Sequence, residues 1–429
     1  MRVMVVGASG LIGSAVCARL AARGDTILAV VHRPTDLGLI PAGTLEIDMT
    51  GATDPADWVP HLTGVDAVVN CAGVLQDSRR DSTRGVHAAG AAALFRACER
   101  AGVRRVVHLS AVGVDRATPT EFSRTKLAGD QALMERDLDW VILRPSVVIG
   151  RAAYGGSALM RGLAAAPVVP IMPDTGLLQI VHLDDVVDAV MFFLLPDAPV
   201  RRAFEVVGPR SSTFDEFLAL LRRWLRWPAA RRFRLPAMLA ALFYKIGDAV
   251  ALLGWRPPVR STARQEIARG ATGDPAPLAR ATGRESRDVA AILMAEPSSV
   301  QERWFAQLYL LKPLVFVVLS LFWIATGVMA LGPGWEQGVG LMLEGGVKHG
   351  LAEATVVAGA AADIWIGVGI AFRRTTRGAL YAALAISLAY AIIGTVLVPR
   401  LWIDPIGPLL KIWPIMVLIL VAIAIHDDR

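Results

Sequence analysis

Three glycines near the start of the chain have the spacing that holds a dinucleotide. They occupy positions 7, 10 and 13 of the segment GASGLIG, directly after the apolar run RVMVV. In this arrangement the first glycine permits a tight turn, the second lets the backbone approach a pyrophosphate, and the third lets the next helix pack on the strand. The free N–H groups at the start of that helix bind phosphate oxygens. We therefore predict a nucleotide-binding turn made of Gly7, Ser9, Gly10, Leu11, Ile12 and Gly13.

The end of the second predicted strand distinguishes between the two dinucleotides. An NAD site usually has an aspartate or glutamate there, which accepts hydrogen bonds from the ribose hydroxyls. The strand TILAVVHR instead ends in His32 and Arg33, so a 2′-phosphate would meet a cation. The alternative is that Arg33 is only a solvated surface residue. We expect NADP(H) to be the preferred cofactor, with NAD(H) as the other candidate.

Alternating strands and helices are predicted to position these residues. A glycine-rich turn alone also fits a loop without a ligand, but here a strand precedes the turn, and a helix and a second strand follow it. The glycines interrupt the first apolar run, so we interpret that run as a strand and not as a targeting segment. The alternation predicts an α/β fold with a doubly wound parallel sheet for residues 1–210. The predicted strands are 2–6, 26–33, 44–48, 66–73, 105–112, 140–147 and 203–208.

In these motifs the first 295 residues resemble the atypical and extended short-chain dehydrogenase/reductase families. The resemblance rests on GASGLIG (7–13), Asp48 after the third strand, NCAG (70–73), HLSAVGV (108–114), FSRTKLAGD (122–130) and LRPSVVIG (143–150). It implies that Asp48 contacts the adenine and that Ala72 and Gly73 line the cofactor trough. It also implies that Lys126 binds the nicotinamide ribose and that Pro145–Val147 flank the nicotinamide.

One position departs from the pattern of these families, which use Tyr-x-x-x-Lys to exchange a proton with the substrate oxygen. This chain has Phe122 in place of the tyrosine, four residues before Lys126. Phenylalanine has no proton to transfer, so carbonyl–alcohol chemistry by that route is in doubt. The resemblance leaves Lys126 and Ser110 as catalytic candidates, although Ser110 equally fits a hydroxyl that satisfies the end of a strand. Ser123 and Tyr154 are candidates to replace the missing proton donor.

No group of residues predicts a metal site. Cys17, Cys71 and Cys98 are scattered and form no CxxC pair, which is typical of reduced thiols in a cytosolic compartment. His182 with Asp184 and Asp185 resembles a metal or acid–base cluster in isolation. The run LDDVVDAV fits better as the start of a helix with acidic residues in its first turn.

Residues 211–300 are predicted to form a connecting helical region. It begins with a capping box from Thr213 to Glu216. Residues 222–269 hold eleven lysines and arginines against two acids. This composition fits a small substrate domain or a basic surface that lies on anionic lipid, and the two readings are compatible. The net charge of +6 accordingly indicates a membrane surface as partner rather than nucleic acid.

Four apolar segments predict a membrane domain over residues 301–429, with spans near 313–335, 354–372, 378–399 and 406–425. The loop Arg373–Arg377 carries three arginines and is expected to stay in the cytoplasm. Four spans then place the nucleotide-binding domain and the C-terminal segment His426–Arg429 on the cytoplasmic side. The expected location is the inner cell membrane, with the lipid bilayer as partner.

The span layout, with a loose pattern of Trp, Gly and Pro, is similar to the DoxX-like family of four-helix membrane proteins. Some members of that family are linked to quinol or thiol redox chemistry, which implies a quinone or another membrane redox partner. Asp363 lies near the middle of the second predicted span, where a carboxylate is costly unless it is paired or neutral. It is either a proton or quinone site or a structural hydrogen bond to a neighbouring helix.

Two classes of function follow. The first is a membrane-anchored NAD(P)H-dependent oxidoreductase that acts on a quinone or another lipid-soluble acceptor. The second is a dinucleotide-binding sensor or assembly subunit without turnover, for which the nucleotide-binding accessory subunit of respiratory complex I is a precedent by resemblance. Phe122 favours the second class, and the membrane domain with Asp363 favours the first.

Overall fold

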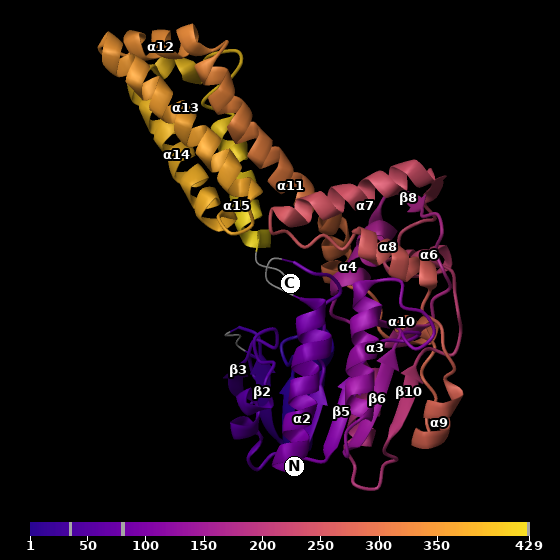
Figure 1. The fold of residues 1–429 in the computed structure, drawn as a ribbon. Coiled ribbons are helices and arrows are strands. Elements are labelled where there is room, and N and C mark those ends of the chain that lie inside the picture. Colours follow the sequence, from indigo (N-terminus) through magenta and orange to yellow (C-terminus); the bar gives the residue numbers. More distant parts are fainter. Residues whose placement is uncertain (34–36, 79–81, 427–429) are drawn as a thin grey trace. The chain divides into compact units, whose positions relative to one another are not determined.

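The computed structural model describes residues 1–33, 37–78 and 82–426, and it falls into two compact units. The first unit comprises Met1–Asp248 and Pro257–Ala306, and the second comprises Ala249–Arg256 and Gln307–Arg429. The chain therefore enters the second unit briefly, returns to the first, and then enters the second again. Figure 1 shows both units and labels many of their elements.

A seven-stranded parallel sheet forms the centre of the first unit. Its order is β10-β6-β5-β4-β1-β2-β3, and the order reverses between β1 and β4, where sheets of this kind bind ligands. All seven predicted strands are present, and the doubly wound α/β class is confirmed. The strands are β1 (Arg2–Val6), β2 (Thr26–Val31), β3 (Ala42–Glu46), β4 (Ala67–Asn70), β5 (Arg105–Leu109), β6 (Asp139–Pro145) and β10 (Arg202–Val206).

Helices cover both faces of this sheet (Figure 1). Val3 and Val5 of β1 belong to the core on one face, and Met4 and Val6 belong to the core on the other. Strands buried on both faces read as unbroken apolar runs, which is why the sequence revealed them. The helices α1 (Leu11–Arg23) and α5 (Leu183–Phe193) cover the first face. The second face is covered by η1 (Pro55–Asp57), η2 (Val59–Leu62), α2 (Ala91–Ala101) and α3 (Glu121–Met134). The helix α2 continues a π-helical segment, η3 (Arg84–Gly90).

A smaller lobe of the same unit has its own core, to which Phe214, Phe217 and Leu221 contribute. The predicted capping box is present, since Thr213 N donates to Glu216 Oε2 at 2.8 Å and Glu216 N donates to Thr213 Oγ1 at 3.2 Å. Two short parallel pairs, β7 (Val147–Ile149) with β9 (Ile180–His182) and β8 (Val168–Ile171) with β11 (Arg231–Arg234), were not predicted. The remaining helices are α4 (Gly155–Ala165), α6 (Phe214–Trp224), α7 (Ala237–Leu252), α8 (Ser261–Arg269), α9 (Ala276–Thr282) and α10 (Val289–Ala295).

The second unit is helical. Its elements are α11 (Val300–Leu331), which begins in the first unit, α12 (Trp335–Glu344), α13 (His349–Ala371), α14 (Thr376–Leu397), η4 (Pro399–Trp402) and α15 (Ile412–His426). Three of them, α11, α13 and α14, are long and apolar enough to cross a membrane. The apolar α15 has 15 residues, so a fourth crossing stays a prediction. The first predicted span began at Pro313, whereas α11 begins at Val300 and contains that proline.

One end of the helical unit is held together by a group of aromatic and basic side chains. Trp255 Nε1 donates to Ala371 O at 2.8 Å, and the Arg373 guanidinium lies 5.4 Å from the centre of the Trp255 ring. The ring of Phe316 lies 5.0 Å from that of Trp255 and 6.2 Å from that of His426. The start of the arginine loop, part of α11 and the end of α15 therefore meet at one end of the bundle. Residues 427–429 of the predicted C-terminal segment lie outside the described residues.

Candidate functional site

The glycine-rich turn between β1 and α1 has a shape that requires glycine at two of its positions. Gly7 has a φ of +76°, and a Cβ on it would stand 2.8 Å from the backbone nitrogen of Ala72. A Cβ on Gly13 would stand 2.1 Å from Gly7 O, because α1 begins directly against the turn. A Cβ on Gly10 would meet only Gly7 O, at 3.3 Å. The protein's own packing therefore dictates Gly7 and Gly13 but not Gly10.

The start of α1 presents backbone donors that the helix itself does not use. Gly10 is the N-cap of α1, and because glycine has no side chain, it makes no capping hydrogen bond. Ser14 N donates to Gly10 O at 2.9 Å and closes the first turn. The N–H groups of Leu11, Ile12 and Gly13 precede that bond, so no carbonyl of α1 is available to them. Such a helix start attracts phosphate groups.

The loops after β4, β5 and β6 bring the other predicted residues to the same edge of the sheet. Ala72 follows β4 and contacts the glycine-rich turn through Gly7. Ser110 follows β5, and its N–H donates to Leu143 O of β6 at 2.8 Å. Pro145 ends β6 and accepts a hydrogen bond from Val112 N at 3.0 Å. The carboxyl ends of parallel strands carry the ligand site in sheets of this order.

Lys126 of α3 reaches this edge with its ammonium group buried. Its Nζ donates to Leu109 O at 2.9 Å and to Ala72 O at 3.3 Å. The side chain is almost completely buried, and this burial lowers the pKa of Lys126 to about 8, although Asp130 and Cys71 act in the opposite direction. A Cβ on Gly73 would stand 3.4 Å from Nζ, so glycine keeps the space beside the ammonium open.

A buried polar cluster lies behind Lys126, and sequence reasoning assigned no role to its members. Asp130 follows Lys126 by one helical turn, and Arg144 Nε donates to its Oδ2 at 3.0 Å. His108 Nε2 lies 3.6 Å from Asp130 Oδ1. Burial raises the pKa of Asp130, and burial with the charges of Lys126 and Arg144 holds the pKa of His108 well below its usual range. His108 is therefore neutral at pH 7.

Ser110 belongs to the same buried cluster. Among the described residues, the ring nitrogens of His108 have no hydrogen-bond partner. The Ser110 hydroxyl interacts with the Asp130 carboxyl and lowers its pKa against the larger effect of burial.

Phe122 occupies the first turn of α3 and packs edge-on against His87, with ring centres 5.6 Å apart. His87 Nε2 accepts a hydrogen bond from Val74 N at 3.0 Å, so the ring proton resides on Nδ1, which lies 3.0 Å from Thr125 Oγ1. Burial and the charge of Lys126 hold the pKa of His87 well below its usual range. The imidazole is neutral and fully engaged. It cannot replace the proton donor that Phe122 lacks.

The two candidates named as replacements differ in their surroundings. Ser123 is completely buried and belongs to the capping box of α3, with its Oγ donating to Thr120 O at 3.2 Å. It has no access to a substrate. Tyr154 is the N-cap of α4, and its side chain is exposed.

The ends of β2 and β3 place charged residues of both signs side by side. His32 Nδ1 lies 3.4 Å from Asp48 Oδ1, and Arg33 is exposed next to the end of β2. Burial acts to raise the pKa of Asp48, but hydrogen bonds from Thr50 and the charges of His32 and Arg33 lower it overall. Asp48 is therefore ionised at pH 7. This corner offers a cation for a 2′-phosphate and a carboxylate for ribose or adenine donors.

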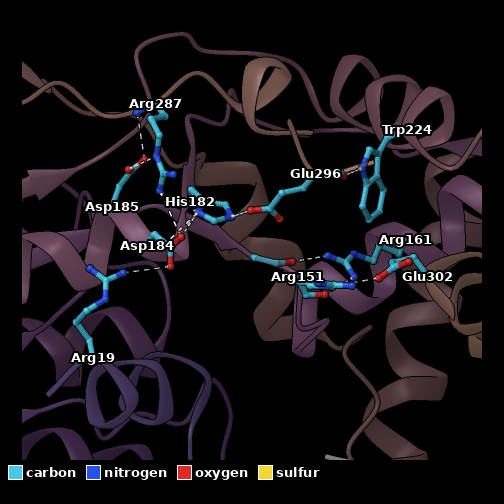
Figure 2. Close-up of polar contacts among 11 residues, drawn as sticks. Arg19, Arg151, Arg161, His182, Asp184, Asp185, Trp224, Arg287, Glu296 and Glu302 are labelled. Atoms are coloured by element: carbon cyan, nitrogen blue, oxygen red, sulfur yellow. Dashed lines mark hydrogen bonds and ion pairs between the residues drawn. The ribbon is translucent and has the colours of Figure 1, made fainter. Parts of the chain in front are cut away.

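The sequence cluster around His182 has a structural role (Figure 2). His182 is the N-cap of α5, where its Nδ1 accepts from Asp184 N at 3.3 Å and lies 3.2 Å from Arg287 Nη2. Arg287 Nε donates to Asp185 Oδ1 at 2.7 Å. The acidic first turn of α5 is present as the sequence predicts, and Arg287 together with Arg19, whose Nη2 lies 3.7 Å from Asp184 Oδ1, pairs with its carboxylates. In the part of the chain that the structure describes, no group of three or more His, Cys, Asp or Glu side chains could hold a metal ion.

The aspartate of the second span has a partner that the sequence did not reveal. Asp363 on α13 is buried, and Tyr390 Oη on α14 donates to its Oδ1 at 2.9 Å. The same hydroxyl lies 3.3 Å from Gly359 O, and a Cβ on Gly359 would stand 3.0 Å from it. Gly359 thus makes room for the tyrosine. This contact is the hydrogen bond to a neighbouring helix that we considered as one alternative for Asp363.

Comparisons with known proteins support two regions of the chain. Residues 7–162 match a family described as NAD(P)H-binding, and residues 320–420 match the DoxX-like family. A (4-alkanoyl-5-oxo-2,5-dihydrofuran-3-yl)methyl phosphate reductase of Streptomyces griseus is 28% identical over 291 residues, covering 66% of this chain and 94% of its own. The 40 kDa subunit of mitochondrial NADH-ubiquinone oxidoreductase of Neurospora crassa is 27% identical over 231 residues, covering 51% and 59%. Matches to mycobacterial proteins at 27% identity span only 23% of the length of those proteins.

Among solved structures, a UDP-glucuronic acid 4-epimerase from Bacillus cereus in complex with UDP-glucuronic acid and NAD is similar with a TM-score of 0.52. The match is 16% identical and covers 72% of this chain and all of the epimerase. A likeness at this identity concerns the fold. The fold of the first unit is thus shared with this epimerase.

Proposed function

We propose that this chain, an NAD(P)-binding protein of the short-chain dehydrogenase/reductase type with a DoxX-like C-terminal domain, is a membrane-anchored oxidoreductase. It prefers NADP(H) and reduces a quinone or another lipid-soluble acceptor. The observation that carries this proposal is Lys126. A buried ammonium with a pKa of about 8 stands between the carboxyl ends of β4 and β5, where it donates to Ala72 O and Leu109 O.

The residues at this edge of the sheet fit a dinucleotide. A Cβ on Gly10 would meet only Gly7 O, and the first N–H groups of α1 are available to phosphate oxygens. Two of the three N–H donors of Lys126 bind Leu109 O and Ala72 O, so one is left for a ribose hydroxyl. Ser110, at the carboxyl end of β5, would lie on the nicotinamide side. Arg33 would meet the 2′-phosphate, and Asp48 the adenine.

Quinone reduction needs one hydride and one proton, and it does not require a tyrosine. The reduced dinucleotide supplies the hydride. The Lys126 ammonium holds a positive charge where the quinone oxygen becomes negative. Its lowered pKa reduces the free energy needed to release a proton near neutral pH. The quinol forms when that oxygen takes this one proton, and water then reprotonates Lys126. Phe122 then serves as an apolar wall against His87.

The helical unit supports a lipid-soluble acceptor. Its three long apolar helices and the DoxX-like match indicate a membrane domain. The Asp363–Tyr390 pair is a polar site among the apolar helices. Polar residues at membrane depth are functional candidates by default. The inner membrane with both chain ends in the cytoplasm remains our proposed location.

The pH dependence of turnover tests the role of Lys126. In nanodiscs, NADPH oxidation with a soluble quinone should fall as pH rises through about 8, because the ammonium deprotonates there. Lys126→Met keeps the approximate shape of the side chain but removes its charge. The residual activity of this variant should therefore lose the pH dependence. The matched control is Lys245→Met, an exposed lysine on α7. A native profile without a decline above pH ~8 contradicts the assignment.

A second candidate function is a dinucleotide-binding subunit without turnover. It is favoured by Phe122, which has no proton to transfer, and by His87, whose ring is fully engaged. A relative named as a subunit of NADH-ubiquinone oxidoreductase is consistent with such a role. Titration of NADPH by intrinsic fluorescence separates the two candidates. Tight binding without oxidation by any quinone in a panel would identify the binding module.

A further inference from the structure

Helix α7 buries one narrow face and exposes a broad apolar one. Its buried residues are Ala240, Tyr244 and Gly247, which recur at helical spacing. Gly247 is needed there because a Cβ would stand 1.8 Å from Val259 O. The rest of the helix exposes large apolar side chains, namely Met238, Leu239, Leu242, Phe243, Ile246 and Leu252. An exposed apolar surface of this kind marks an interaction site.

Positive charge accompanies this apolar face. Strand β11 directly precedes α7 and exposes all four of its residues, three arginines and Phe233. Between residues 226 and 247 the chain has five cations, Arg226, Arg231, Arg232, Arg234 and Lys245, and no aspartate or glutamate. Within the described residues, Arg231, Arg232 and Arg234 form no ion pair. Apolar and basic residues combined on one short segment are typical of a helix that lies on anionic lipid.

The end of α7 leads into the helical unit. Its last residues and the turn up to Arg256 belong to that unit. There Leu253 O accepts a hydrogen bond from Arg373 N at 3.1 Å, and Trp255 packs under the Arg373 guanidinium. The arginine loop marks the end of the bundle expected at the cytoplasmic headgroups, a depth at which tryptophan is enriched. The segment that follows α7 is therefore tied to that end of the bundle.

We infer that α7 and β11 form a docking surface for the anionic lipid headgroups and upper acyl chains of the bilayer around the helical unit. The apolar side chains of α7 enter the bilayer surface, and the arginines of β11 bind lipid phosphates. The inference rests on the proposed insertion of the helical unit into a membrane, but not on the proposed reaction. It gives a function to the basic region that the nucleotide site does not use.

Lipid-depth quenching in the full chain tests this surface. Single cysteines replace Met238 and Phe243, carry a fluorophore, and are reconstituted in nanodiscs of phosphatidylglycerol and phosphatidylcholine with brominated acyl chains. The unsubstituted protein measures background labelling, because Cys17 and Cys98 are buried and Cys71 is half-buried. Leu195→Cys is the matched control, an exposed apolar residue beside Pro196, whose carbonyl binds Arg105 at the amino end of β5.

We expect quenching at positions 238 and 243 and none at 195. Val357→Cys on an exposed face of α13 reports insertion of the helical unit. Quenching at 357 without quenching at 238 and 243 overturns the docking surface alone. Absence of quenching at 357 overturns membrane insertion and, with it, the docking surface.

The contribution of positive charge to lipid docking is measured in two ways. The triple variant Arg231→Gln/Arg232→Gln/Arg234→Gln removes the cations of β11, and discs of pure phosphatidylcholine remove the anionic lipid. Each change, as well as high salt, should reduce quenching at position 243 by about half or more, because headgroup attraction is electrostatic and screened. If the 238 label is shielded from water without lipid quenching and forms disulfides between copies, the surface is a protein interface instead. That result would overturn the inference.

Discussion

At the scale of single residues, Phe122 stands where the families that this chain resembles have a tyrosine. Its ring packs edge-on against His87, and Lys126 reaches Leu109 O and Ala72 O. What is lost is one hydroxyl at the position that exchanges a proton with a carbonyl substrate. A buried lysine with a lowered pKa is retained, which suits a reaction whose acceptor becomes an anion.

Phe122→Tyr tests whether that hydroxyl is all that carbonyl chemistry lacks. The native protein should oxidise simple alcohols with NADP⁺ only weakly, and the variant should gain about 10²–10⁴-fold if the rest of the site is competent. Phe122→Leu is the apolar control and should show no gain. The rate of NADPH formation measures all three proteins. Robust alcohol oxidation by the native chain would refute this account of Phe122.

Arg33 is expected to determine the preference between the two dinucleotides. Arg33→Gln should weaken NADPH binding by ~1.5–3 kcal/mol, the scale of a hydrogen bond to a charged group, and leave NADH nearly unchanged. Asp48 stays in place and can still accept from ribose or adenine donors. Calorimetric titration of both nucleotides measures the effect, with the exposed Arg100→Gln on α2 as control. Equal native affinities for NADPH and NADH would show that Arg33 is only a surface residue.

At the scale of elements, the turn between β1 and α1 separates folding from binding. Gly13→Ala forces a Cβ to 2.1 Å from Gly7 O, so it should destabilise the first unit by ~1–3 kcal/mol. Gly10→Ala brings its Cβ only to 3.3 Å from the same oxygen and should fold normally. It should nevertheless lose nucleotide affinity, because the methyl group occupies the phosphate approach.

Thermal unfolding measures the stability of Gly13→Ala and Gly10→Ala, and NADPH titration measures their nucleotide affinity. The control is Gly51→Ala, whose Cβ would stand 3.7 Å from Asp48 O in ordinary contact. A folded Gly10→Ala protein with native affinity would place the nucleotide elsewhere.

The elements that the sequence predicted are those in which apolar residues follow a simple pattern along the chain. The central strands are buried on both faces and appear as apolar runs, whereas β7, β8 and β9 have only three or four residues. Strand β11 reads RRFR, is fully exposed, and carries no apolar signal. Its existence depends on pairing with β8, about sixty residues earlier in the chain, and no local pattern records that.

The candidate site was predictable to the same extent. The glycine turn and Lys126 belong to contiguous motifs, so their spacing could be read directly. His108, Asp130 and Arg144 form their cluster from β5, α3 and β6, and Tyr390 reaches Asp363 across two helices. Such partners are defined by tertiary packing. A buried polar residue at an apolar position, such as His108 in β5, was the one available signal.

At the scale of the whole molecule, the two units differ in where their apolar side chains lie, as expected for one unit in water and one in lipid. In the first unit the sheet places its aliphatic side chains in two closed cores. The helical unit leaves large apolar side chains such as Leu321, Trp365 and Val396 exposed. In water such exposure would cause association, whereas in a bilayer these side chains face lipid.

The ends of the helical unit bear on its topology. Phe316 of α11 and His426 of α15 lie within ring contact, and Arg373 Nη2 donates to His426 O at 3.2 Å. The first and last helices therefore meet at the end that carries the arginine loop. An antiparallel bundle with this property crosses the membrane an even number of times. With 15 residues, α15 spans about 22 Å at 1.5 Å per residue, which is shorter than the hydrocarbon core and requires flanking residues or local thinning.

We therefore predict that reporter fusions after residue 429 and within Arg373–Arg377 are cytoplasmic, while a fusion at Gly338 in α12 lies on the opposite side. Two independent features of the helical unit lead to this expectation. The arginine loop sets the orientation through its charge, and the contact between Phe316 and His426 sets the parity of the crossings. A phosphatase active only outside the cytoplasm and a fluorescent protein active only inside it give complementary readouts at each position. Replacing all three loop arginines with glutamine should weaken the orientation without changing parity, so the C-terminal and loop reporters should still agree with each other. A C-terminal reporter found opposite the loop would mean that α15 does not cross, and the proposed fourth span would then be wrong.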